Sequence, residues 1–345
     1  MTEDALSATP SVRTKCEGHL GRIILDRPAK LNALDADTAA GISRVLAAWA
    51  NEGGVRQILL ESSSPRAFCA GGDLKTIREV LLNAGPDEGF ARMDRAYDTM
   101  LQLARYTKPV VSFLDGIVMG GGVGIGCHVG YRVVTERSVL AMPETAIGLV
   151  TDAGGSWLLS RAAGHEGLRL ALTGQRMSGQ DAVRLGLADR LVPAESLESL
   201  RDSLALEDVE EVFANLPTGP ATLVGADAEP GYALESCYAA PDLPSAMERL
   251  RASPLESAHQ DMDELSRACP FSLYAAWHAW HRARKARSLE EAFDIERRLV
   301  RCVLGRADIV EGVRARLVDR DNAPVWQPAS LQAMTPAELQ EIQAA

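Results

Sequence analysis

The 345-residue sequence contains little that would support a disulfide framework, a metal site or a membrane span. Its six cysteines are scattered and form no CxxC pair, which argues against a disulfide scaffold and a standard zinc motif and favours a reducing compartment. The close histidine pair, His278 and His281, lacks the acid of an HExxH motif. No apolar run approaches a membrane span, and Met1 to Pro10 lack the basic and apolar regions of a signal peptide. We therefore expect a cytoplasmic protein with no metal and no membrane partner.

The chain has few basic residues relative to acidic ones: 36 lysines and arginines and 47 aspartates and glutamates give a net charge of −11. Such a chain lacks the basic footprint of a nucleic-acid-binding protein, so we expect no nucleic acid partner. An anionic ligand would have to be held locally by a few cations and helix N-termini. With 46% hydrophobic residues, the length allows one large core and an additional part.

Short apolar runs alternate with amphipathic stretches over the first 193 residues, which is typical of α/β layering. Strands are predicted at 22–25, 57–61, 110–114, 131–135, 139–141 and 189–192, and helices from Asp35 or Asp37 to about 50, after Asp73, and at 91–105, 153–163, 167–172 and 179–185. Residues 85–90 are predicted to be a loop. From 244 to 317 the pattern is helical, after a Pro- and Gly-rich connection at 217–231. We predict an α/β core over 1–205 and a mostly helical domain over 206–345.

Two glycine-rich turns are the most informative feature of the chain: Phe68-Cys69-Ala70-Gly71-Gly72-Asp73-Leu74 and Met119-Gly120-Gly121-Gly122-Val123-Gly124. Each follows a strand-like run and precedes a helix-like one. Alone, each is explained by a tight turn or by close helix packing. Together they can direct two backbone N–H groups at one oxygen, the arrangement that stabilises an oxyanion. We predict that the amides of Ala70 and Gly121 are the donors.

Two acids follow these turns and are candidate proton carriers. Glu144 comes after Pro143 among apolar residues, where loss of hydration raises the pKa of a carboxyl group towards the working range of a general acid or base. Asp152 precedes Ala153-Gly154-Gly155, so it is suited to cap the next helix as well as to take part in the chemistry.

Two other groups of residues admit a functional explanation and a simpler one. Cys69 and Cys127 border the glycine turns, and His128 is adjacent to Cys127, but neighbouring residues on a helix do not face each other. Both cysteines are expected to be small packing residues. The arginine-rich run at 282–287 is expected to be a solvated helix face, with contact to a nucleotide phosphate as the alternative.

The segments FCAGGDL, KPVVSFLDGIVMGGGVG and AMPETAIGL resemble the crotonase (enoyl-CoA hydratase/isomerase) superfamily. The longer stretches VVTERSVLAMPETAIGLVTDAGGSWLLSR and EEAFDIERRLVRCVL resemble its 3-hydroxyisobutyryl-CoA hydrolase branch. The resemblance covers most of the chain, from about residue 21 to 331. It implies a spiral of ββα units followed by a helical domain that closes the acyl pocket and mediates homo-oligomers.

The resemblance also implies a coenzyme A thioester as substrate, with no separate cofactor. Its acyl carbonyl would lie between the amides at Ala70 and Gly121, and the family loop that touches the nucleotide and pantetheine matches Lys30-Leu31-Asn32-Ala33. Lys30 and Arg27 become candidate phosphate partners, with an ordinary solvated loop as the alternative. The acid matching Asp152 contacts the hydroxyl end of the acyl group. The implied substrate-binding residues are Lys30, Asn32, Ala33, Phe68, Gly71, Gly72, Asp73, Gly120 and Gly122.

The reaction class depends on one position. Hydratases of the superfamily carry a second glutamate where this chain has Gly124, so the resemblance favours hydrolysis of a short 3-hydroxyacyl-CoA thioester. Glu144 would activate water or attack the carbonyl itself. Ala96 and Val150-Thr151 depart from the branch pattern, which leaves the acyl group open. The alternatives are a hydratase or isomerase reaction and a catalytically silent CoA-binding protein.

Overall fold

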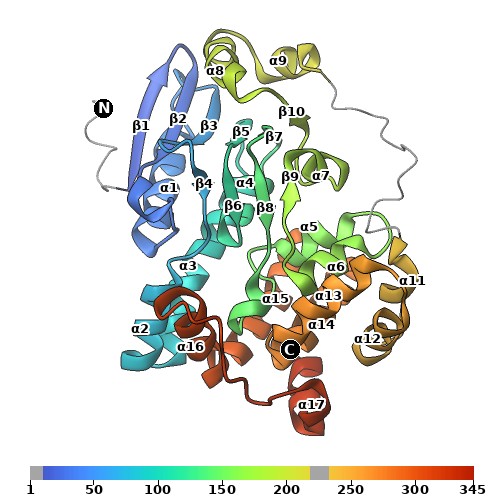
Figure 1. Ribbon diagram of the computed structural model, residues 1–345. Helices are drawn as coiled ribbons and strands as arrows, with labels where there is room; N and C mark the ends of the chain where they lie inside the picture. The colour runs from blue at the N-terminus through green and yellow to red at the C-terminus, as the bar shows by residue number, and fades with distance from the viewer. Residues whose placement is uncertain (1–10, 218–232) are drawn as a thin grey trace. The chain divides into compact units, whose positions relative to one another are not determined.

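The computed structural model describes residues 11–217 and 233–345, which form two compact units (Figure 1). The first unit consists of residues 11–73, 92–141 and 176–217. The second consists of residues 74–91, 142–175 and 233–345. Residues 142–175, which carry both predicted acids, therefore pack with the C-terminal helices.

The first unit is built on a six-stranded sheet in the order β1-β2-β3-β5-β7-β10. Strands β1 and β2 are antiparallel, and the other neighbours are parallel. Apolar residues on both faces, typical of a covered parallel sheet, make β3 and β5 almost entirely buried. The bounds are β1 (Val12–Glu17), β2 (Leu20–Leu25), β3 (Gln57–Ser62), β5 (Val110–Leu114), β7 (Tyr131–Val134) and β10 (Arg190–Leu191).

A second sheet of four short strands has the order β4-β6-β8-β9. Its members are β4 (Ala67–Cys69), β6 (Ile117–Met119), β8 (Val139–Ala141) and β9 (Met177–Ser178). Along the chain, β3, β5 and β7 of the large sheet are each followed by a strand of the small one. This alternation is the predicted spiral of ββα units. In this sheet only β8 was predicted. The strands β4, β6 and β9 were missed because so few residues show little periodicity, and β1 of the large sheet was missed because most of its side chains are not buried.

Helices complete the first unit. Helix α1 (Ala36–Trp49) begins at Asp35, whose side chain accepts a hydrogen bond of 2.8 Å from the Thr38 amide, and its predicted apolar face is buried. Helices α8 (Leu197–Leu206) and α9 (Val209–Asn215) supply Leu204 and Phe213 to a core formed with the large sheet. Helix α4 (Gly121–Cys127) begins inside the second glycine turn, and α7 (Gly179–Arg184) follows β9.

The second unit is helical. Helix α14 (Pro270–Lys285) packs against α5 (Gly155–Arg161), α6 (Glu166–Thr173) and α15 (Leu289–Leu304). Beyond β10, every regular element in the described part of the chain is a helix, as predicted. The remaining helices are α2 (Leu74–Ala84), α11 (Glu235–Tyr238), α12 (Leu243–Ala252), α13 (Glu256–Arg267), α16 (Ala307–Val313) and α17 (Pro336–Ala344).

One local prediction was wrong. Residues 86–90 are not loop but the first turn of α3 (Pro86–Ala104), which continues through 91–104. Proline is favourable in the first turn because its missing N–H has no intrahelical acceptor there, and Asp87 and Glu88 favour a helix N-terminus. Most of the predicted connection at 217–231 lies outside the described residues.

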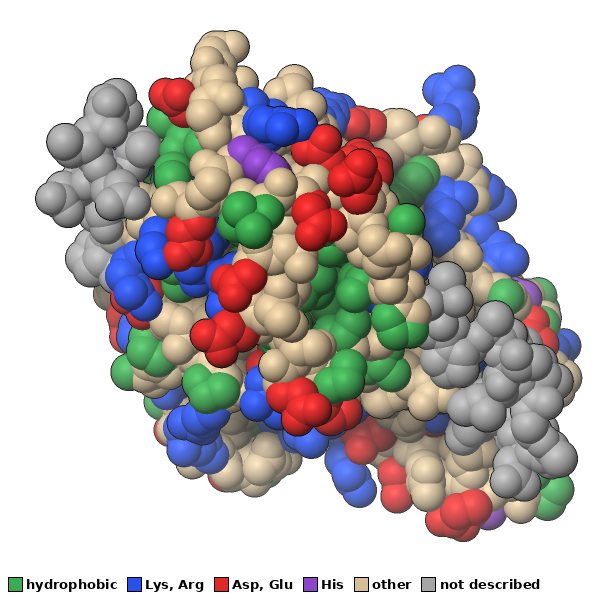
Figure 2. Space-filling model, turned by 90° about the horizontal axis from the view of Figure 1, so that it is seen from above, with side chains coloured by type: hydrophobic (Ala, Val, Ile, Leu, Met, Phe, Trp, Pro, Cys, Tyr) green, Lys and Arg blue, Asp and Glu red, His purple; other side chains and the backbone are tan. Residues whose placement is uncertain are grey.

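The surface carries charges of both signs. On the face in Figure 2, acidic and basic side chains are interspersed with small hydrophobic areas. Within residues 11–217 and 233–345, no helix is long and apolar enough to cross a membrane. The same residues contain no group of three or more His, Cys, Asp or Glu side chains placed to hold a metal ion.

Candidate active site

Both glycine turns require glycine for steric reasons. Gly71 has a φ of +106° and Gly120 a φ of +49°, which side chains rarely adopt. A β-carbon on Gly122 would lie 2.2 Å from the Cys69 carbonyl oxygen, so α4 can approach β4 this closely only without a side chain. The two turns are therefore in direct backbone contact, as an amide pair for one ligand requires.

The structure changes the assignment of the first amide. The Ala70 N–H donates to the Leu31 carbonyl at 3.0 Å, so it already has an acceptor within the protein. The exposed Gly72 has no acceptor for its N–H among the described residues, and a β-carbon on Gly121 would lie 3.5 Å from the Gly72 nitrogen. Gly121 is the first residue of α4, where the N–H has no intrahelical acceptor. The pair free to meet a carbonyl oxygen is Gly72 and Gly121.

Asn32 lies beneath the first turn with its side chain 2% exposed. Its Nδ2 donates to Ser62 Oγ at 2.6 Å and to the Phe68 carbonyl at 3.0 Å, and its Oδ1 accepts from the Arg27 amide at 2.7 Å. Both polar atoms are thus bonded to protein. Asn32 therefore stabilises the backbone that leads into the first glycine turn.

Asp73, the last polar residue of the first turn, forms ion pairs with both candidate phosphate partners. Lys30 Nζ lies 2.9 Å and Arg27 Nη2 3.2 Å from Asp73 Oδ2. Arg27 is also paired with Asp35 at 2.9 Å and donates to the Ala33 carbonyl. The Lys30 side chain is more than half exposed, which makes it the more accessible of the two cations.

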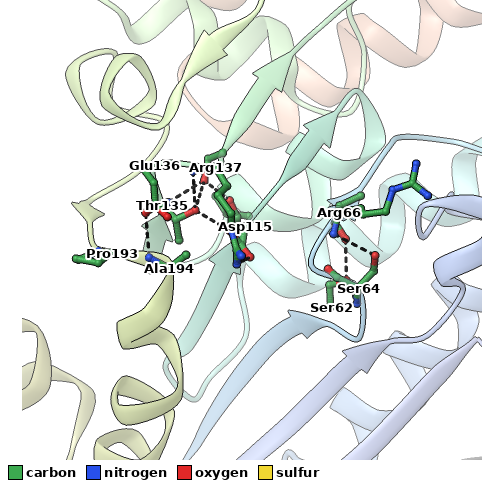
Figure 3. Close-up of polar contacts among 12 residues, drawn as sticks. Ser62, Ser64, Arg66, Asp115, Thr135, Glu136, Arg137, Pro193 and Ala194 are labelled. Atoms are coloured by element: carbon green, nitrogen blue, oxygen red, sulfur yellow. Dashed lines mark hydrogen bonds and ion pairs between the residues drawn. The ribbon is translucent and has the colours of Figure 1, made fainter.

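Polar side chains also fix the loops at the carboxyl ends of the parallel strands (Figure 3). Thr135 Oγ1 and Arg137 Nε donate to Asp115 Oδ1 at 2.6 and 3.0 Å, and this links the segments that follow β7 and β5. After β3, the Ser64 amide donates to Ser62 Oγ at 2.9 Å. The same hydroxyl oxygen accepts the hydrogen bond from Asn32 Nδ2. The Ser62 bond ties the end of β3 to the segment that precedes β4.

Glu144 lies in the second unit, at the start of a 3₁₀ turn, Glu144–Ile147. The turn is anchored on both sides, since the Thr145 hydroxyl donates to the Leu172 carbonyl at 2.9 Å and its carbonyl accepts from the Cys269 amide at 2.9 Å. The Glu144 side chain is 4% exposed, and its Oε2 is buried with no hydrogen-bond partner among the described residues. A buried carboxyl oxygen without a partner is costly and is retained where a ligand or water supplies one.

Asp152 is also buried, at 5% exposed, and begins a strained turn. Ala153 and Gly154 both adopt left-handed conformations, with φ of +58° and +72°, and the Gly155 amide donates to the Asp152 carbonyl at 2.7 Å. Left-handed alanine is uncommon, and such strain persists only where surrounding contacts hold it. Asp152 thus precedes a helix as predicted, but it sits one turn before α5 on a fixed loop.

The pKa of Glu144 is raised well above its usual value, first because burial removes hydration from the charged form and then because the negative charge of Asp152 opposes ionisation. Glu296 adds to the same effect. This confirms the expected direction of the shift.

Glu296, on α15, was not predicted from the sequence. It is 1% exposed, its carboxylate binds the backbone around Gly154, and burial raises its pKa to about 8. The available signal was a glutamate at a core position of an amphipathic helix, and core positions almost never hold a glutamate without a partner.

The remaining candidates occupy packed positions. Cys69 and Cys127 are buried, and burial raises the pKa of each thiol to about 12, so they fit the predicted packing role. Gly124 is buried within α4. Val150 and Thr151 are fully buried, and the Thr151 hydroxyl donates to the Ala171 carbonyl at 3.2 Å.

Comparison with known proteins places this geometry in a family. Residues 20–342 match the model of the enoyl-CoA hydratase/isomerase family. Among curated proteins, mitochondrial 3-hydroxyisobutyryl-CoA hydrolase of Rattus norvegicus is 34% identical over 342 residues, covering 96% of this chain and 88% of that protein. The protein of the same name from Homo sapiens is 34% identical over 347 residues, with the same coverage.

Solved structures agree on the fold. A carnitinyl-CoA dehydratase from Mycobacterium thermoresistibile has a TM-score of 0.90 and 35% identity, covering 97% of this chain and 96% of that one. An enoyl-CoA hydratase from Rhodobacter sphaeroides has a TM-score of 0.89 and 34% identity, covering 97% of both chains. These matches confirm the predicted crotonase-type fold. The chain belongs to the enoyl-CoA hydratase/isomerase family.

Proposed function

We propose that this protein hydrolyses a short-chain 3-hydroxyacyl-CoA thioester, of the kind represented by 3-hydroxyisobutyryl-CoA, to the free acid and coenzyme A. One observation carries the proposal: the Oε2 of Glu144 is buried without a protein partner, as a group that works on a bound substrate or water would be. The names of the relatives at 32–34% identity, over 84–89% of their length, support the same reaction.

In the proposed reaction the amides of Gly72 and Gly121 donate to the thioester carbonyl oxygen and stabilise the negative charge that develops on it. Ionised Glu144 takes a proton from water as the water oxygen bonds to the acyl carbon. The carbon–sulfur bond then breaks, and the proton passes from Glu144 to the departing thiolate. In the second route, Glu144 attacks the carbonyl itself, the carbon–sulfur bond breaks and the thiolate leaves. Water then hydrolyses the anhydride, which gives the free acid, restores the Glu144 carboxylate and releases the proton that the thiolate takes up. Both routes need the ionised carboxylate.

Other residues have roles in substrate choice. Asp152 is proposed to contact the 3-hydroxyl group, and Lys30 to contact a phosphate of coenzyme A. Ala96 and the Val150-Thr151 pair are proposed to alter the preferred acyl group. Coenzyme A enters as part of the substrate, so the proposal includes no separate cofactor. It places the reaction in the cytoplasm, although the curated relatives are named mitochondrial.

A hydration or dehydration reaction is the second candidate, because two solved relatives at 34–35% identity are titled as a dehydratase and a hydratase. Gly124 argues against the route that uses two glutamates around one water. The assay for thiol release must therefore be run beside an assay for the enoyl absorbance, with crotonyl-CoA as the substrate of the second reaction.

The test is a panel of short acyl-CoA thioesters with detection of free thiol. We expect release of coenzyme A from 3-hydroxyisobutyryl-CoA by the wild type. Glu144→Ala should lose turnover while keeping its affinity for the substrate, measured by calorimetry. The exposed Glu195→Gln serves as the matched control and should behave as wild type. Near-normal turnover by Glu144→Ala would refute the role of this residue, and binding without turnover by the wild type would favour a silent CoA-binding protein.

A further inference from the structure

The carboxylate of Glu296 accepts three hydrogen bonds from the turn that follows Asp152. Glu296 Oε2 accepts from the Gly154 amide at 2.7 Å, and Oε1 accepts from the Ser156 amide at 3.1 Å and from the Ser156 hydroxyl. Each carboxylate oxygen is used, and these contacts join residues 140 or more positions apart in the chain. The side chain is fully enclosed on α15.

The hydrogen bonds from Glu296 lie at the strained part of the turn. Ala153 and Gly154 are consecutive left-handed residues, and a left-handed alanine costs free energy that surrounding contacts must offset. Glu296 bonds the amide that joins these two residues and the amide and hydroxyl of Ser156, which follows them. Because Asp152 immediately precedes this turn, the conformation of the turn sets the position and direction of the Asp152 Cα–Cβ bond.

We infer that Glu296 is a positioning residue, whose carboxylate holds the Ala153-Gly154 turn and thereby presents Asp152 for the proposed hydrolysis. The inference rests on that proposed function and adds a residue to it. Glu296 itself is bonded to protein on both oxygens, so it is not assigned any contact with substrate.

When Glu296 is ionised, at pH values above its pKa of about 8, its charge also acts on Glu144. The groups whose charge bears on Glu144 are Asp152 and Glu296, and both oppose its ionisation. A glutamine at 296 keeps the size of the side chain and removes that charge. It also presents an NH₂ group where the carboxylate accepted a hydrogen bond, which loosens one side of the turn.

The experiment compares wild type, Glu296→Gln and Asp294→Asn. Asp294 is an exposed acid two residues earlier on α15, so its variant makes the same chemical change away from the turn. For Glu296→Gln we expect kcat to fall about 10- to 100-fold with KM within about twofold, because Asp152 would be misplaced. Asp294→Asn should match the wild type.

Two further readouts need no turnover. Amide hydrogen exchange at Gly154 and Ser156 should be faster in Glu296→Gln, and the pKa of Glu144, followed by carboxyl-carbon NMR, should fall. The fall in the pKa of Glu144 reports the loss of the Glu296 charge, whereas faster exchange at Gly154 and Ser156 reports the loss of its hydrogen bonds to the turn. Ser156→Ala removes one donor and keeps the charge, so it should speed exchange at the turn with a smaller loss of kcat.

The outcomes separate the two proposals. If the wild type hydrolyses no acyl-CoA, the proposed function fails, and the exchange and NMR measurements still decide whether Glu296 holds the turn. If Glu296→Gln equals Asp294→Asn in kcat and in exchange at Gly154 and Ser156, the inference is overturned, whatever happens to the pKa of Glu144.

Discussion

Replacing Asn32 tests whether this residue holds the first glycine turn or binds substrate directly. Asn32→Ala leaves two groups without partners, the Arg27 amide and the Phe68 carbonyl, at about 1–3 kcal/mol each. Ser62 Oγ still donates to the Ala67 carbonyl at 2.7 Å, so that pair stays satisfied. Asn32 also has a φ of +55°, which alanine adopts less readily. The sum predicts a loss of about 4 kcal/mol in the free energy of unfolding.

Urea unfolding followed by tryptophan fluorescence measures this loss. Asn83→Ala is the matched control, because Asn83 is exposed and makes one local bond to the Glu79 carbonyl. Its expected change is within about 0.5 kcal/mol. The affinity for coenzyme A, measured by calorimetry under native conditions, is the second readout. If Asn32→Ala lost less than about 1 kcal/mol of stability while its affinity for coenzyme A collapsed, Asn32 would be a ligand contact and the structural reasoning would be wrong.

Two further predictions concern packing and pH. Gly122→Ala should destabilise the protein by about 1–3 kcal/mol in urea unfolding, because its β-carbon meets the Cys69 carbonyl. Gly130→Ala should be tolerated, because its β-carbon would meet only the Val110 carbonyl oxygen, at 4.0 Å. Equal stabilities of the two variants would contradict the close approach at Gly122. The raised pKa of Glu144 means that its contribution to stability is fully present below the unfolded value of 4.5 and is lost as pH rises through the folded pKa. Glu144→Gln should therefore gain stability over wild type as pH increases, and parallel stability–pH curves for the two proteins would show that Glu144 is not the cause.

Local patterns determined much of the architecture. The alternation of apolar runs and amphipathic stretches indicated every strand of the large sheet except β1, and most of the helices up to α7, because backbone periodicity is a property of consecutive residues. Asp35 was a recognisable cap for α1, and the glycine turns stood out because few other residues tolerate such close approach. Pro86 carried a helix-start signal that the loop prediction overlooked.

The sequence did not predict hydrogen bonds between residues that are far apart in the chain. The Ala70 amide is taken by Leu31, 39 positions earlier, which moves the free donor to Gly72. Which amide remains free depends on every acceptor that folding brings near it, and no local pattern encodes that competition.

The sequence by itself determined that two glycine turns follow strands and that an acid, Glu144, follows Pro143 in apolar surroundings. Only the tertiary structure decided that the Asn32 side chain bonds to Ser62 and to the backbone of Arg27 and Phe68, and that Glu296 on α15 bonds to the turn after Asp152. The physical reason is that conformational preference and burial are local properties of a chain, whereas the partners of a buried polar atom are chosen by the packing of distant segments.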